Sequence, residues 1–143
     1  MPYDKITLPP QAMAANLPAR IAETVSSRLM PDDVLVCQLS VGSHVDHVIV
    51  RQAAELIGRQ LIYDIDVPYI FYKPEELEPK AAGMKESLQT ISEAGLKSWQ
   101  EAAVQYKSQL PSLGEAMETP EIARKSIHNY WSARRGIPLL QIG

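Results

Sequence analysis

Two histidines and an aspartate stand close together in the chain, at His44, Asp46 and His47. Because the histidines are three residues apart, the first turn of a helix would place both imidazoles on the same side, facing one point. Imidazoles bind metal ions and transfer protons, and a carboxylate such as that of Asp46 can fix which ring nitrogen carries the proton. The spacing therefore predicts a metal-binding or proton-transferring site. The alternative is a helix cap with solvated polar groups and no further role.

The segments on either side of these residues are typical of a strand, a loop and a helix. Residues 34–39 are a short, nearly continuous apolar run, which predicts a strand covered on both faces in a parallel sheet. Residues 40–43 form a tight loop, and apolar residues recur on one face of a helix from about 45 to 58. In open α/β sheets, ligands bind beyond the carboxyl ends of the strands, and His44 and His47 fall there.

The rest of the chain continues the alternation of helix and strand. Residues 17–30 have apolar side chains every four positions, which predicts a helix, and 61–65 read as a second strand. We expect an exposed loop at 75–83 and a third strand at 85–91. Two helices are expected after it, at 93–110 with Ser92 as its cap and at 120–135 with Thr119 as its cap. This order predicts an α/β fold with mostly parallel strands.

Length, charge and cysteine content limit the class of protein. A chain of 143 residues fits a single domain, 1–143, and residues 1–16 read as an irregular lead-in rich in proline. A net charge of −3 without a basic stripe argues against nucleic acid as a partner. The single cysteine, Cys37, has no disulfide partner, and no apolar run is long enough to span a membrane. We therefore expect a cytoplasmic protein that does not bind membranes.

Three stretches resemble motifs of the PIG-L/LmbE-like deacetylases, and they occur in the family's order between residues 17 and 130. Residues 41–54 resemble the family's second signature, Gly-x-His-x-Asp-His followed by a helix of the type Val-x-x-Ala-Ala. Residues 66–69 are similar to an acidic-Pro-Tyr segment, and residues 106–109 to a Tyr-Arg-Ser-Gln helix.

The resemblance implies a Rossmann-like, three-layer α/β fold and a mononuclear zinc site that removes N-acetyl groups from amino-sugar conjugates. It implies that His47 is a zinc ligand, that His44 stabilises the oxyanion or acts as an acid, and that Asp46 orients His44. Amide hydrolysis needs an activated water, stabilisation of the oxyanion and a proton for the leaving amine, and these groups suit that chemistry.

The chain departs from the family at one motif. The family's first signature, Ala-His-Pro-Asp-Asp-Glu, is absent, and residues 30–34 offer only an echo of it without a histidine, which reads as a turn from helix to strand. Catalytic zinc takes three protein ligands. We therefore expect only the C-terminal part of the deacetylase domain, with half of the metal site, no turnover by this chain alone, and a homo-oligomer that covers the open edge of the sheet.

Two other functions stay open at this point. One is a catalytically dead α/β module for ligand binding or oligomerisation. The other is a different metallohydrolase, in which a second copy of the chain supplies acidic ligands to His44 and His47. The third histidine, His128, is expected to be a partly buried structural residue, and Trp99, Tyr106 and Trp131 are expected in the core.

Overall fold

The structure is a computed structural model, and it describes residues 16–134 and 136–143. These residues form two compact units, each described below by itself. One unit comprises residues 16–86 with Leu139–Gly143, and the other comprises Ser87–Pro138. Apart from residue 16, the predicted irregular lead-in lies outside the described residues.

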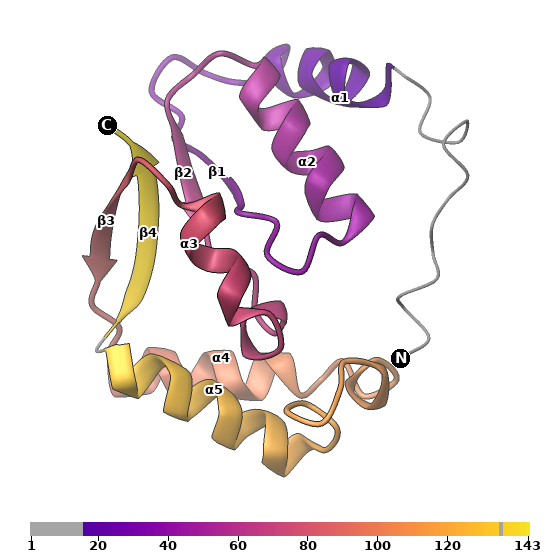
Figure 1. Cartoon of the computed structure of the whole chain (residues 1–143), viewed down its shortest axis with the longest axis vertical. Coiled ribbons are helices and arrows are strands. Elements are labelled where there is room, and N and C mark those ends of the chain that lie inside the picture. Colours follow the sequence, from indigo (N-terminus) through magenta and orange to yellow (C-terminus); the bar gives the residue numbers. More distant parts are fainter. Residues whose placement is uncertain (1–15, 135) are drawn as a thin grey trace. The chain divides into compact units, whose positions relative to one another are not determined.

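Among the described residues, the strands form a four-stranded mixed sheet in the order β1-β2-β4-β3. These are β1 (Leu35–Gln38), β2 (Leu61–Asp64), β3 (Met84–Gln89) and β4 (Ile137–Ile142). β1 and β2 are parallel, with Gln38 beside Asp64, while β2 and β4 are antiparallel. The predicted α/β class is confirmed (Figure 1). β4 was not predicted, because its six residues follow a helix end directly and alternate only weakly.

Two helices accompany β1 in the first unit. α1 (Leu17–Ser26) packs against α2 (Val45–Leu56), and α2 packs against β1. The predicted helix at 17–30 is therefore confirmed but ends four residues early. The prediction that both faces of the first strand are covered is wrong, since Cys37 is buried while Val36 and Gln38 are exposed. That alternation is typical of a strand packed on one face only. Burial raises the pKa of the Cys37 thiol to about 11.

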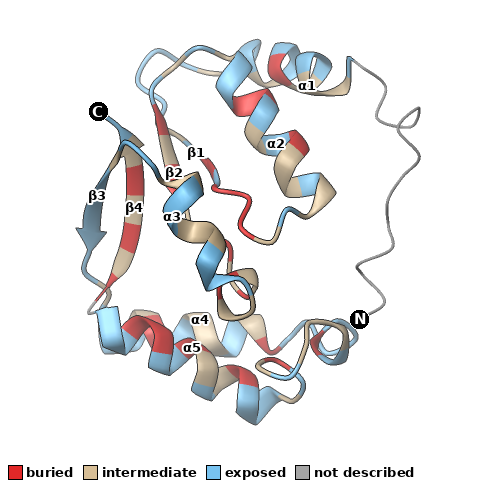
Figure 2. Cartoon of the chain, in the orientation of Figure 1, coloured by how far each residue is buried: buried red, intermediate tan, exposed pale blue. Residues whose placement is uncertain are grey.

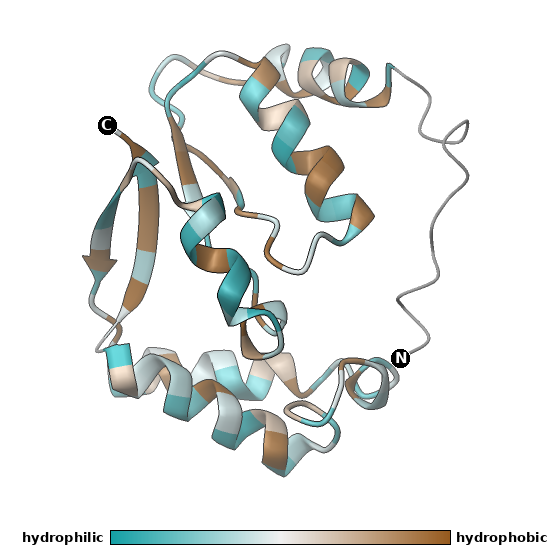
Figure 3. Cartoon of the chain, in the orientation of Figure 1, coloured by the Kyte–Doolittle hydropathy of each residue, from teal (hydrophilic) through white to brown (hydrophobic). Residues whose placement is uncertain are grey.

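The segment expected as an exposed loop at 75–83 contains helical turns instead. η2 (Tyr69–Phe71), η3 (Pro74–Glu76) and α3 (Leu77–Lys80) follow β2 in succession. α3 carries mostly hydrophilic residues (Figure 3). Glu76 and Lys80 of this segment nevertheless make hydrogen bonds to the residues that follow β1, as described below. These contacts tie the polar segment to the rest of the unit.

The second unit contains α4 (Glu93–Ala103), η4 (Leu110–Ser112) and α5 (Pro120–Arg134), and α4 packs against α5. Both predicted caps are confirmed: Ser92 Oγ accepts from Gly95 N–H at 3.0 Å, and Thr119 Oγ1 accepts from Ile122 N–H at 3.2 Å. The last helix was predicted to end at residue 135, which lies outside the described residues.

Two expectations in this unit are wrong. The predicted helix at 93–110 ends at Ala103; turns and η4 follow, and they bury Val104 and Leu110, so tertiary packing overrides the helical period here. Tyr106 is therefore not in the core but 68% exposed. His128, expected to be partly buried, is exposed on α5.

No helix among residues 16–134 and 136–143 has the length and apolar character needed to cross a membrane.

Candidate functional site

A tight turn of residues 40–43 connects β1 to α2 and places the histidines. The chain leaves the sheet through Leu39, whose N–H donates to Asp64 O at 2.8 Å. The turn closes with a bond from Ser43 N–H to Ser40 O at 3.1 Å. Ser40, Gly42 and Ser43 have φ values of +63°, +81° and +53°, in the left-handed region. Residues 39–41 are buried, whereas Gly42 is half-buried and Ser43 is exposed, so the turn starts in the core of the unit and ends at its surface (Figure 2).

Two side chains that follow β2 contact this turn: Glu76, the last residue of η3, and Lys80, the last residue of α3. Glu76 Oε2 accepts from Gly42 N–H at 3.0 Å and from the Ser43 hydroxyl at 3.3 Å. Lys80 Nζ donates to Ser40 O at 2.7 Å and to Ser43 Oγ at 3.0 Å, and it lies 3.4 Å from Glu76 Oε2. These bonds satisfy backbone groups that the strained turn leaves without partners in the sheet.

His44 and His47 lie side by side at the start of α2, as the sequence predicts. Their ring centroids are 5.4 Å apart. The Tyr69 ring lies 5.9 Å from that of His44 and 5.2 Å from that of His47, so one aromatic side chain contacts both imidazoles. Tyr69 also packs against the turn, since a Cβ built on Gly42 would lie 2.5 Å from Tyr69 Cδ1.

His44 is the N-cap residue of α2, and Asp46 lies next to it. His44 Nδ1 accepts from the backbone N–H of Asp46 at 3.3 Å. The Asp46 carboxylate is 3.9 Å from the same nitrogen and its side chain is 75% exposed. The contact of Asp46 with His44 therefore runs through its backbone amide, and its carboxylate lies in solvent at the positive end of the helix.

Asp66 is the carboxylate that contacts His47. Asp66 Oδ1 lies 2.6 Å from His47 Nδ1, and Asp66 Oδ2 accepts from Val41 N–H at 2.8 Å. Sequence reasoning assigned residues 66–69 only to a family motif and missed this contact. A usable signal exists: Asp66 follows β2, and the carboxyl ends of parallel neighbours β1 and β2 meet at one edge of the sheet.

A second set of polar side chains supports the body of α2. Arg51 Nη1 donates to Leu39 O at 2.8 Å and its Nε donates to Glu55 Oε1 at 2.8 Å. The Tyr63 hydroxyl donates to Glu55 Oε1 at 3.2 Å. Burial, with Glu55 nearby, raises the pKa of Tyr63 to about 12. Burial also raises the pKa of Asp64, and the neighbouring charge of Asp66 adds to this.

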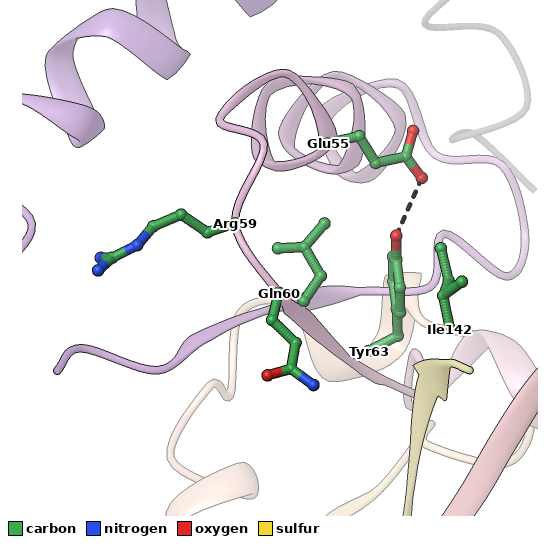
Figure 4. A pocket seen from close by; sticks show the side chains of 6 residues that line it. Glu55, Arg59, Gln60, Tyr63 and Ile142 are labelled. Carbon is green, nitrogen blue, oxygen red and sulfur yellow. Dashed lines mark hydrogen bonds between the residues drawn. The ribbon is translucent and has the colours of Figure 1, made fainter. Parts of the chain in front are cut away.

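A pocket of about 240 Å³ lies elsewhere in this unit, without a residue of the histidine pair in its lining. It is lined by Glu55, Arg59, Gln60, Leu61, Tyr63 and Ile142 (Figure 4). Arg59 already donates to the carbonyls of Met30 and Pro31. The polar groups of Arg59, Tyr63 and Glu55 in the lining are thus engaged by the protein itself.

The described residues do not complete a catalytic zinc site. Such a site takes three protein ligands, commonly histidine, aspartate, glutamate or cysteine. In the part of the chain that the structure describes, no group of three or more such side chains could hold a metal ion. His44 and His47 can therefore supply at most part of a ligand set.

The fold is shared with a solved deacetylase. The chain is similar to the crystal structure of the zinc-inhibited form of teicoplanin deacetylase Orf2, with a TM-score of 0.67 and 19% sequence identity over 92% of this chain. The chain spans 54% of that protein's length. No family model matches the sequence, and no curated protein matches it. At this identity the likeness concerns the fold.

Proposed function

We propose that this chain is a PIG-L/LmbE-like protein that carries part of a deacetylase-type hydrolytic site. One observation carries the proposal. His44 and His47 lie side by side at the carboxyl ends of the parallel strands β1 and β2, in a fold shared with teicoplanin deacetylase. That edge of an α/β sheet is where ligands usually bind.

The proposed roles follow the chemistry of amide hydrolysis. His47 is a ligand for Zn²⁺ in the completed site. His44 accepts a hydrogen bond at Nδ1 from Asp46 N–H, so the neutral ring carries its proton on Nε2 and can donate to an oxyanion. Asp46 orients His44 through this bond. The substrate class that we propose is an N-acetylated amino-sugar conjugate, after the family that the motifs resemble.

We propose further that this chain does not turn over substrate by itself, because the described residues provide too few zinc ligands. The test is acetate release from N-acetyl amino-sugar conjugates with added zinc, for the unmodified chain and for His47→Ala. We expect both samples to match the uncatalysed rate. Release that disappears in His47→Ala would contradict the incomplete site while supporting the deacetylase class.

The open edge of the sheet supports self-association. β1 is an edge strand of the described sheet; Val36 on it is 52% exposed, and Val34, just before the strand begins, is 69% exposed. Such edges pair with other strands unless they are blocked. We propose that a second copy of the chain pairs along β1 and forms a homodimer.

A charge on β1 should prevent this pairing. We expect light scattering to give a dimer mass for the unmodified chain and a monomer mass for Val36→Lys, because a lysine on an edge strand disfavours strand addition. Val50→Lys is the control, since Val50 is also exposed but lies on α2. Equal masses for the two variants would contradict the proposed interface.

A further inference from the structure

Asp66 has both carboxylate oxygens committed inside the protein. Its side chain is 0% exposed. One oxygen, Oδ2, accepts from Val41 N–H at 2.8 Å, and the other, Oδ1, lies 2.6 Å from His47 Nδ1. The carboxylate thus joins three segments: the chain just after β2, the turn after β1 and the first turn of α2.

The bond to Val41 fixes which oxygen faces the histidine. Val41 is fully buried, and a buried backbone N–H needs an acceptor. A backbone amide cannot turn away, so Oδ2 has to remain its acceptor and Oδ1 is left for His47. An ionised carboxylate only accepts hydrogen bonds. With an ionised Asp66, the hydrogen bond between Oδ1 and Nδ1 requires the proton to be on the imidazole.

We infer that Asp66 is a positioning residue that selects the Nδ1–H tautomer of His47. A neutral imidazole carries one proton, so its Nε2 then holds a lone pair. That nitrogen can coordinate a metal ion or accept a proton. The use of this lone pair in hydrolysis rests on the proposed function, whereas the tautomer itself does not.

The neighbouring His44 provides a contrast. Its Nδ1 accepts from Asp46 N–H, so the neutral ring has its proton on Nε2. The two imidazoles, with centroids 5.4 Å apart, then present opposite groups at their Nε2 atoms. His47 offers an acceptor and His44 offers a donor. A polarised amide, which needs attack on its carbon and stabilisation of its oxygen, suits such a pair.

Asp66→Asn separates positioning from a merely structural role. The asparagine side chain has the same shape but only one oxygen. Because Val41 N–H keeps that oxygen, the amide NH₂ faces His47 Nδ1 and donates to it. Nδ1 then becomes the acceptor, and the proton of the neutral ring moves to Nε2.

The measurement is long-range ¹H–¹⁵N correlation NMR on histidine-labelled protein, at an alkaline pH where the imidazoles are neutral. We expect a protonated Nδ1 and an unprotonated Nε2 for His47 in the unmodified chain, and the reverse in Asp66→Asn. His44 should keep its pattern in both samples.

The spectrum of the unmodified chain decides the inference even where Asp66→Asn fails to fold. A His47 protonated on Nε2 in that spectrum would overturn it, as would an unchanged His47 in a folded Asp66→Asn. A confirmed tautomer combined with no binding of zinc by His47 would instead contradict the proposed function alone.

Discussion

Replacing Gly42 by alanine is expected to cost about 2–4 kcal/mol of folding free energy, since it combines left-handed backbone strain with overpacking. Gly42 has a φ of +81°, and its added Cβ would lie 2.5 Å from Tyr69 Cδ1 and 2.8 Å from Tyr69 Cβ. Tyr69 Cβ cannot move without its backbone, so rotation of the ring does not relieve the contact. Urea unfolding followed by circular dichroism measures the loss.

Gly58→Ala is the matched control for this prediction. Gly58 has a similar φ of +70°, but nothing lies within 4 Å of an added Cβ. Its substitution should cost only the backbone strain, about 1 kcal/mol. Equal losses for the two variants would mean that the approach of Tyr69 to the turn contributes nothing, contrary to the geometry of the site.

Asp66→Ala is expected to cost about 2–4 kcal/mol, because it leaves buried polar groups without partners. Val41 N–H and His47 Nδ1 both lose the carboxylate that they contact. The free energy of unfolding, measured as above, should fall by this amount.

Asp46→Ala is the comparison for Asp66. The Asp46 carboxylate is largely exposed, and its backbone N–H, which bonds His44, stays in the variant. We expect a loss of at most about 1 kcal/mol, the contribution of an acidic residue to the first turn of a helix. A larger loss for Asp46→Ala than for Asp66→Ala would contradict the assignment of the supporting carboxylate.

Local patterns predicted the elements that carry the histidines. The apolar run before residue 40, the short loop and the helical period after residue 45 gave the strand, turn and helix in the right order. The spacing of His44 and His47 predicted that their rings lie together, and they do. These features depend on neighbours in sequence, which a single sequence contains.

The contacts that support the histidines could not be predicted in this way. Asp66 reaches His47 across 19 residues, and Lys80 reaches the Ser40 carbonyl across 40. The residues that Asp66 and Lys80 contact depend on how β1 and β2 align in the sheet. The segment from Pro74 to Lys80 is polar, so its sequence alone predicts a solvated loop. Its contacts with the turn of residues 40–43 exist only in the folded chain. α4 also ends earlier than its period predicts, because Val104 and Leu110 are buried through turns and η4 instead of a continued helix, an arrangement that depends on tertiary packing.

Zinc binding by His47 tests the central claim most directly. Isothermal titration of the chain with zinc should show weak binding that does not survive dialysis, because part of a ligand set holds the metal less firmly than three ligands do. The binding should disappear in His47→Ala and remain in His128→Ala, whose histidine is exposed on α5. Zinc binding that is the same in both variants would contradict a metal-ligating His47, and firm stoichiometric zinc would contradict an incomplete site.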